Sequence, residues 1–214
     1  MRKGLFLVLE GVEGAGKSTQ ARLLSDWFLS LNVPHILARE PGGTPVGEAI
    51  REVVLDRGRL TMPAETELFL ILGARAAFTR DLVLPALREG KVVLADRFDM
   101  STFAYQGYGR GLDLEQLKQS NRLATGGLVP DLYLLLDLPV ALGLERKGGV
   151  EEGDRIEREG STFLSRVAEG YRTLAQQMAS ARLVPASGTQ EEVQTSLREV
   201  LRGRFPETFP AGGV

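Results

Sequence analysis

The sequence predicts an α/β fold in which helices cover both faces of a doubly wound, five-stranded parallel sheet. Short apolar runs without polar alternation, as expected of strands buried on both faces, are separated by longer stretches with helical periodicity. A glycine-rich loop joins the first apolar run to the first helical stretch. With 214 residues, 43% of them hydrophobic and 25% charged, the chain can bury a sizeable core, and we expect a single domain over residues 1–214.

The elements follow one another along the chain with strands and helices in alternation. The predicted strands are the apolar segments at residues 5–9, 35–38, 91–95, 132–136 and 182–184. The predicted helices cover residues 17–31, 65–89, 140–146 and 161–178, with a kink or break at Pro85 in the second of them. A polar, glycine-containing stretch at about residues 147–160 is expected to be a mobile lid, and residues 206–214 a frayed tail.

Composition excludes several kinds of chemistry. The chain has no cysteine and a single histidine, His35, so disulfides, cysteine-ligated metals and a histidine triad are excluded within one chain. We expect His35, Trp27 and Phe28 to serve packing. A net charge of −2 does not predict a nucleic-acid partner. The N-terminal apolar run at residues 5–9 is too short for a signal peptide or a membrane helix, so we expect a cytoplasmic protein without a membrane partner.

The most specific motif lies between the first strand and the first helix. Residues 11–18 read Gly-Val-Glu-Gly-Ala-Gly-Lys-Ser, which fits the P-loop pattern of a glycine, four residues and Gly-Lys-Ser. Backbone amides of such a loop wrap a phosphate, and the helix that follows adds its N-terminal dipole. Lys17 can bridge the β- and γ-phosphates, and the Ser18 hydroxyl can hold magnesium. We expect the nucleoside triphosphate to be bound by Gly11, Val12, Glu13, Gly14, Ala15, Gly16, Lys17, Ser18 and Thr19.

Charged residues also follow the second and third strands. In an open parallel sheet, ligands bind beyond the carboxyl ends of the strands, so these charges are expected at the same site. Asp96 could hold magnesium through water and Arg97 could neutralise a transferred phosphoryl group, although a structural ion pair explains the two residues equally well. The segment at residues 39–44 places Arg39 at the same edge, and a plain turn is its alternative reading.

Together these segments resemble the thymidylate kinase family, in its bacterial type. The matching segments fall in the family's order along nearly the whole chain, at residues 10–19, 39–44, 96–98, 101–107, 130–132 and 154–157. The resemblance implies a P-loop nucleoside monophosphate kinase fold, a homodimer, and magnesium-dependent transfer of the ATP γ-phosphoryl group to dTMP. The products would be dTDP and ADP, in dTTP biosynthesis.

The resemblance also implies roles for residues in the phosphate region. Lys17 and Ser18 would serve ATP and magnesium, and Glu13 would meet the acceptor's 3′-hydroxyl or a metal-bound water. From electrostatics alone, Glu13 must face away from the phosphates, onto a sugar hydroxyl, a metal-bound water or solvent. Arg39 and Arg97 would hold the acceptor phosphate and the phosphoryl group in flight.

For the acceptor nucleoside, the resemblance implies that Arg75 hydrogen-bonds the base with help from Thr102. Tyr105 would crowd the 2′ position and favour deoxyribose. The family usually places a phenylalanine one helical turn before the base-reading arginine, to stack on thymine. Here that position is Ile71, and the nearby Phe69 falls on another helix face, so Ile71 is expected to give apolar contact only.

A second departure concerns the P-loop. Gly14 stands where eukaryotic members carry an arginine, and bacterial members that lack it usually supply arginines from the lid. Of the cations in this lid, we expect Arg155 to be the catalytic one; a surface pair between Asp154 and Arg155 is the alternative.

No general base is required for the expected reaction, because the second pKa of a phosphate monoester is about 6 and the acceptor oxygen is already anionic at neutral pH. Catalysis would rest on positioning and charge neutralisation. Two alternatives stay open: a kinase of another nucleoside monophosphate or of a deoxynucleoside, and a P-loop regulatory ATPase.

Overall fold

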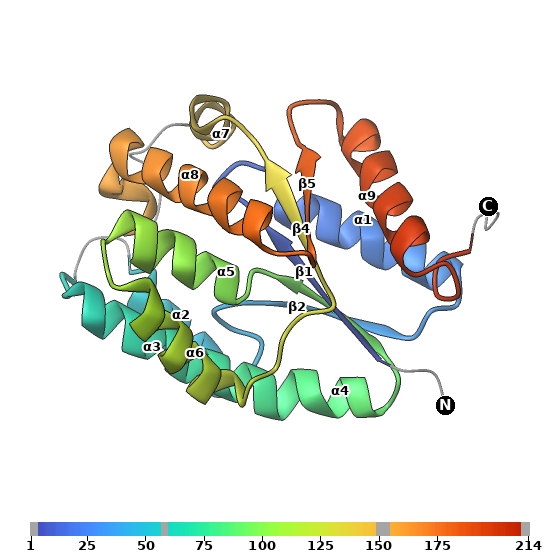
Figure 1. Cartoon of the computed structure of the whole chain (residues 1–214), viewed down its shortest axis with the longest axis horizontal. Coiled ribbons are helices and arrows are strands. Elements are labelled where there is room, and N and C mark those ends of the chain that lie inside the picture. The colour runs from blue at the N-terminus through green and yellow to red at the C-terminus, as the bar shows by residue number, and fades with distance from the viewer. Residues whose placement is uncertain (1–3, 57–59, 149–154, 211–214) are drawn as a thin grey trace.

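The computed structural model describes residues 4–56, 60–148 and 155–210, which are organised around a five-stranded parallel sheet (Figure 1). The strands are β1 (Leu5–Glu10), β2 (His35–Arg39), β3 (Val92–Asp96), β4 (Leu132–Asp137) and β5 (Ala181–Pro185). They lie in the order β2-β3-β1-β4-β5. Every predicted strand is therefore confirmed, with ends that differ by at most one residue.

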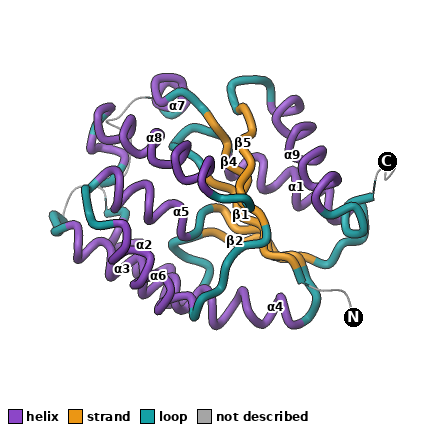
Figure 2. The backbone as a smooth tube through the Cα atoms, in the orientation of Figure 1, coloured by secondary structure: helices purple, strands orange, loops and turns teal. Residues whose placement is uncertain are grey.

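Helices cover both faces of this sheet (Figure 2). They are α1 (Lys17–Ser30), α2 (Pro45–Val54), α3 (Ala64–Ala77), η1 (Phe78–Val83), α4 (Leu84–Arg88), α5 (Asp99–Thr102), η2 (Phe103–Gly109), α6 (Leu114–Thr125), α7 (Val140–Arg146), η3 (Glu157–Glu159), α8 (Ser161–Gln177) and α9 (Gln190–Arg204). Helices α1 and α9 lie side by side on one flank, and α3, α6 and α8 lie on the other (Figure 1). The doubly wound α/β class is confirmed.

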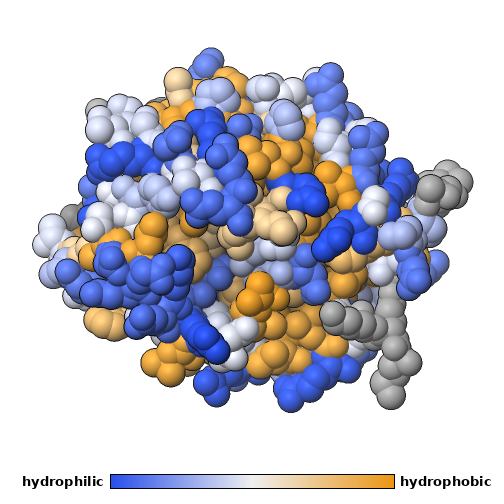
Figure 3. Space-filling model, in the orientation of Figure 1, coloured by the Kyte–Doolittle hydropathy of each residue, from blue (hydrophilic) through white to orange (hydrophobic). Residues whose placement is uncertain are grey.

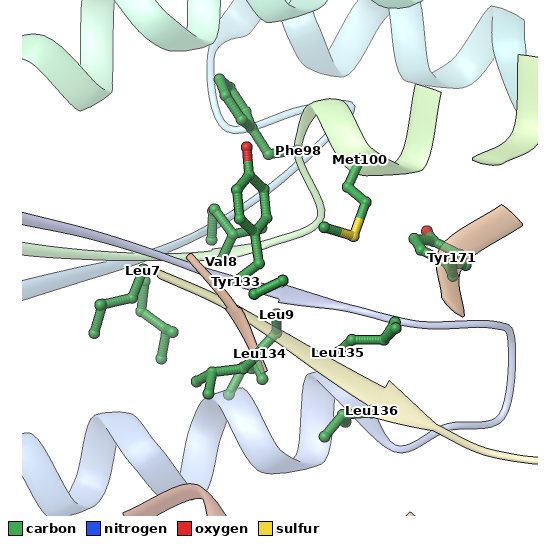
Figure 4. Packing of buried hydrophobic residues seen from close by; sticks show 14 of the residues in the cluster. Leu7, Val8, Leu9, Phe98, Met100, Tyr133, Leu134, Leu135, Leu136 and Tyr171 are labelled. Atoms are coloured by element: carbon green, nitrogen blue, oxygen red, sulfur yellow. The ribbon is translucent and has the colours of Figure 1, made fainter. Parts of the chain in front are cut away.

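The central strands β1 and β4 supply much of the hydrophobic core. All six residues of β1 are buried, and alternate side chains of β4 serve opposite faces of the sheet. In Figure 4, Leu134 points to one face while Tyr133 points to the other, toward Phe98. Among the large hydrophobic side chains that stay at the surface is Phe69, 67% exposed, which confirms that it faces away from the interior. The face shown in Figure 3 mixes hydrophobic patches with hydrophilic side chains.

Helices α2, α6 and α9 were not predicted, although all three carry capping residues in the sequence, Asp113 being the cap of α6. Thr44 caps α2 by accepting a hydrogen bond from the Gly47 amide at 3.0 Å, and Pro45 occupies the first turn, where its missing N–H is harmless. Thr189 and Glu192 form a complete capping box at the start of α9. Interpreting Pro-Gly-Gly-Thr as a plain turn hid the first of these signals.

The long helical segment predicted at residues 65–89 is one continuous path with a widened middle. Its central part, η1, is π-helical and runs into α4, where Pro85 lies in the first turn. Proline cannot donate to the carbonyl four residues earlier, and its ring crowds that carbonyl, so a wider turn before Pro85 relieves both problems. The predicted kink is thus a local widening.

The expectation of a frayed tail from residue 206 onward is wrong for residues 206–210; residues 211–214 lie outside the described residues. Phe209 is fully buried, and its ring stacks on Trp27 and Phe28 with centroids 5.3 and 4.8 Å apart. The proline and glycine content of the segment indicated a loop but not that one aromatic side chain anchors it. His35 packs edge-on against Phe28, which agrees with its expected role in packing.

We expect Phe209→Ala to lower the free energy of unfolding by about 3–5 kcal/mol, because it leaves a cavity between α1 and the end of the chain. Urea denaturation followed by circular dichroism measures this. Val129→Ala, at a position that is 65% exposed, is the control and should change stability by less than about 0.5 kcal/mol. Equal stability of the two variants would mean that the tail does not pack as described.

Candidate active site

A cavity of about 480 Å³ opens at the carboxyl ends of β1, β2 and β3. Its walls come from the P-loop, the loop after β2, helix α3, the segment after β3 and the end of α7. Residues far apart in the sequence therefore meet at one sheet edge, as the parallel topology requires. Of the predicted site residues, this cavity collects Glu13, Gly14, Gly16, Lys17, Ser18, Thr19, Arg39, Ile71, Arg75, Asp96, Arg97, Thr102 and Tyr105.

The P-loop is shaped by close backbone packing. Gly14 has a φ of 72°, and a Cβ at this position would lie 2.2 Å from the carbonyl oxygen of Gly143 in α7. An arginine at position 14 is therefore sterically excluded in this chain. The buried side chain of Lys17 folds back over the loop, and its Nζ donates to the carbonyls of Gly11 and Val12 at 3.0 and 2.9 Å. Within the loop, Val12 and Ala15 are buried.

Burial lowers the pKa of Lys17, and the nearby positive charge of Arg97 lowers it further. Negative charge from Glu13 and Asp96 opposes both effects. A bound triphosphate would add strong negative charge at the same place and stabilise the protonated amine. The Lys17 amine is therefore positioned in the loop to bind an anionic ligand such as a triphosphate.

A hydroxyl and a carboxylate lie together where the P-loop meets β3. Ser18 Oγ donates to Asp96 Oδ2 at 2.7 Å. Hard oxygen ligands of this kind suit Mg²⁺, which usually takes only one or two protein ligands beside the phosphates of its nucleotide. Among the described residues, no group of three or more histidine, aspartate or glutamate side chains could hold a metal alone. Ser18 and Asp96 thus fit the magnesium site that the sequence predicts.

Arg97 lies at the centre of the cavity in a strained conformation. Its φ of 75° falls in the left-handed region, which a non-glycine residue adopts at a cost of about 1–3 kcal/mol. Its guanidinium pairs with Glu13 and donates to the hydroxyl of Tyr171 at 2.9 Å. The hydroxyl of Tyr105 donates to Glu13 at 3.0 Å. Arg97 is held by several contacts at once, which is what fixes a guanidinium in place before a ligand arrives.

Glu13 faces this arginine, and its side chain is 21% exposed. Burial would raise its pKa, but the charges of Arg97 and then Lys17 outweigh burial and hold the pKa at about 2. Burial likewise opposes ionisation of Arg97, yet the charge of Glu13 raises its pKa well above the usual value. Both groups are ionised at neutral pH.

Glu10 was missed by the sequence analysis because it reads as the last residue of a strand. Its buried carboxylate accepts from the amides of Phe98 and Ser101 at 2.9 and 3.2 Å, from Ser101 Oγ at 2.6 Å and from Tyr171 at 3.0 Å. Two of these donors, Ser101 and Tyr171, also contact Arg97. Glu10 therefore fixes the loop after β3 and supports Arg97 indirectly.

Arg75 also lines the cavity, is 1% exposed and is bound on every side. Its Nε and Nη2 form a fork onto Glu40, at 2.9 and 2.7 Å to Oε2. Nη2 also donates to the carbonyl of Phe98, and Nη1 donates to Thr102 Oγ1 at 2.8 Å and to Asn121 Oδ1 at 3.0 Å. A carbonyl of a bound base could reach the N–H groups of Arg75 only by sharing them with these acceptors. The hydroxyl of Thr102 accepts from Arg75, so its own proton is available for donation to a ligand.

The remaining acceptor-side residues differ in character. Arg39 is largely exposed and pairs with Glu48 at 3.0 Å, so its guanidinium can turn toward the cavity at little cost. Ile71 is buried and lines the cavity at the position expected for an aromatic. Two further lining residues were missed: Arg51, whose Nη1 donates to the Pro41 carbonyl at 2.8 Å, and Gln106.

The expected catalytic cation of the lid is not brought to the P-loop in this structure. Arg155 is described, but its guanidinium contacts Glu67 and the carbonyl of Val54, and it does not line the cavity. Arg146 and Lys147, at the end of α7, line it instead. Asp154, the proposed surface partner of Arg155, lies outside the described residues.

Comparisons with known proteins establish the family of this chain. The model of the family described as thymidylate kinase matches residues 9–197. The chain belongs to the thymidylate kinase family. The thymidylate kinase of Symbiobacterium thermophilum is 43% identical over 211 residues, which cover 98% of both chains, and that of Desulforudis audaxviator is 53% identical over 80% of this chain and 78% of its own. The crystal structure of thymidylate kinase from Ehrlichia chaffeensis superposes with a TM-score of 0.77, at 27% identity, over 93% of this chain and 99% of that one.

We expect Lys17→Ala to lower kcat by about 100-fold or more, since removal of one positioned donor at a developing charge has an effect of that order. The fold should survive, because the amine contacts only two loop carbonyls. Coupled measurement of ADP release, with circular dichroism as the folding control, tests this. Near-normal turnover in a folded variant would contradict the assignment of the phosphate site.

Glu40 gives the stability of this family member a characteristic pH dependence. Burial raises its pKa to about 7 from the ordinary 4.5, although the charge of Arg75 opposes the shift. Between these two pH values the folded chain holds a proton on Glu40 that the unfolded chain has released. The resulting contribution to the free energy of unfolding is complete below pH 4.5 and is lost as the pH rises toward 7. We expect the contribution to total up to about 3 kcal/mol.

Urea denaturation of the wild type and of Glu40→Gln between pH 4.5 and pH 8 measures this effect. The variant, whose amide stays neutral like the protonated carboxyl, should match the wild type near pH 4.5, and its stability should fall less steeply with pH. Identical pH slopes for the two proteins would contradict the raised pKa of Glu40.

Proposed function

We propose that this member of the thymidylate kinase family transfers the γ-phosphoryl group of ATP to the 5′-phosphate of dTMP by in-line displacement, giving dTDP and ADP. Family membership makes the chain an ATP-dependent kinase of dTMP, a phosphotransferase. The observation that carries the in-line geometry is the shared cavity. Its lining combines the P-loop lysine, the buried Arg75 and Arg97, which lies close enough to Lys17 to lower the pKa of that amine. Two anionic ligands can therefore meet head to head at Arg97.

In this proposal the triphosphate lies on residues 11–19, with Lys17 on its β- and γ-phosphates. Magnesium would be held by Ser18 and, through water, by Asp96, and would neutralise charge on the triphosphate. Gly14 provides no cation, so Arg146 or Lys147, which line the cavity beside the P-loop, would complete the neutralisation.

The acceptor phosphate would lie between Arg39 and Arg97, with Arg51 beside them. Its nucleophilic oxygen is anionic at neutral pH, so the site needs no base. Glu13 already holds Arg97 in its buried position, and Tyr105, hydrogen-bonded to Glu13, would crowd a ribose 2′-hydroxyl and favour deoxyribose. These side chains are oriented before binding, which is the main source of rate enhancement in such sites.

We further propose a cytoplasmic homodimer. Among the described residues, no helix combines the length and the apolar character that crossing a bilayer requires. Helices α2 and α3 pack together and leave Val46, Val53 and Phe69 exposed by 58%, 40% and 67%. Apolar side chains gathered on adjacent helices are typical of an interface between subunits. Light scattering after size exclusion should give twice the mass of 23.3 kDa.

The acceptor is tested by ADP formation from magnesium ATP with dTMP, dUMP, UMP, CMP, AMP, GMP and thymidine offered separately, and the product identified by chromatography. Strong stimulation by dTMP, and weaker stimulation by dUMP, is expected. A preference for another monophosphate would change the substrate assignment and retain the P-loop. No stimulation by any acceptor would favour a regulatory ATPase.

We expect Arg97→Ala to lower kcat by about 10³-fold, the lower end of the effect of an arginine on phosphoryl transfer, while the KM for ATP changes less than about threefold. Steady-state kinetics with each substrate varied in turn give both values. Comparable losses in kcat and in ATP affinity would instead assign Arg97 a purely positional role.

A further inference from the structure

Arg155, in the segment predicted to be a lid, is anchored to helices α2 and α3. The guanidinium of Arg155 pairs with Glu67 of α3, and its Nε donates to the carbonyl of Val54, the last residue of α2, at 3.1 Å. The side chains of Arg155 and Glu67 are only 11% and 1% exposed. Separating this pair would leave the buried carboxylate of Glu67 with Arg110 and Gln106 as its remaining partners, and would cost the contact of two largely desolvated charges.

A second contact holds the same segment. Arg110, at the end of η2, donates to Glu67 through Nη2 at 2.9 Å and pairs with Glu159 in η3. Its guanidinium also lies over the ring of Phe163, 4.9 Å from the centroid. Residues 155–160 are thus fixed at both of their ends against α3 and η2.

Each of the three anchoring residues adjoins a residue that lines the cavity. Leu55 follows Val54, Ile71 lies one helical turn beyond Glu67 on α3, and Ile156 follows Arg155. Ile71 and Ile156 are 7% and 9% exposed. Pairing of the anchors therefore brings three aliphatic side chains from three separate segments to the same cavity.

We propose that Arg155 is a positioning residue: with Glu67 it holds Ile156 beside Ile71 and Leu55, and these three side chains form the apolar wall that receives the acceptor base. The wall takes the place of a stacking aromatic. The proposal rests on the proposed function, in that the acceptor is a nucleotide whose base enters this end of the cavity. It predicts that Arg155 governs acceptor affinity and not the chemical step.

The first test compares Arg155→Gln with the wild type in steady-state kinetics. The expected result is a rise of about tenfold in the KM for dTMP, in line with the loss of one aliphatic contact, with kcat and the KM for ATP changed less than about threefold. A cation at the transferred phosphoryl group would instead lower kcat by about 10³-fold or more, which would overturn the proposal. The control is Arg158→Gln, which removes an exposed arginine from η3 and should change none of these values.

The second test asks whether Arg155, Glu67 and Ile156 act as one unit. Ile156→Ala should reproduce the rise in KM for dTMP, and the double variant Glu67→Gln/Arg155→Gln should be no worse than Glu67→Gln alone. Independent, additive effects would overturn the proposal. Arg155→Lys, which keeps the charge, should recover part of the affinity.

A third readout does not depend on the reaction. In hydrogen exchange, the amides of residues 156–160 should exchange at least about tenfold faster in Arg155→Gln than in the wild type, and at the wild-type rate in Arg158→Gln. Unchanged exchange would overturn the anchoring. If the wild type prefers another nucleotide, the proposed function fails, and the same kinetic comparison with that nucleotide still decides the role of Arg155.

Discussion

The site depends on the pairing of charges that the fold removes from water. A parallel sheet gathers the carboxyl ends of β1, β2 and β3 at one edge, and the side chains that follow them are largely buried. An isolated charge there would be costly, so the two buried guanidinium groups are each paired with a carboxylate: Arg97 with Glu13, and Arg75 with Glu40. These ion pairs orient the guanidinium groups before any substrate is present.

The contacts of three arginines that line the cavity also differ, and these contacts determine what each guanidinium can do. Arg97 has partners on several elements and remains beside Lys17, where charge changes during phosphoryl transfer, so it can act without reorganising. Arg75 has every donor engaged, and it holds Thr102 in place as much as it offers contacts of its own. Exposed Arg39 is the adaptable cation, able to follow the acceptor phosphate. In the proposed reaction, three arginines in different environments would thus serve the chemical step, recognition of the base and capture of the acceptor phosphate.

Much of this arrangement is predictable from sequence, because strands, the P-loop and the motifs at strand ends are local signals. The partners are not. Glu13 and Arg97 are 84 residues apart, and Glu40 and Arg75 are 35 apart, so only the folded sheet edge makes them pairs. The role of Glu10 was not predicted, because the sequence around a carboxylate at a strand end does not show which groups donate hydrogen bonds to it. Arg155 was expected at the phosphates because nothing in the sequence shows that its partner is a buried glutamate on α3.

A crystal structure with dTMP, magnesium and a non-hydrolysable ATP analogue tests the account most directly. It should show the triphosphate on the P-loop, the acceptor phosphate against Arg97, and the base between Thr102 and the wall of Ile71 and Ile156, with Arg155 still paired to Glu67. A base placed away from that wall, or Arg155 in contact with the phosphates, would contradict the account.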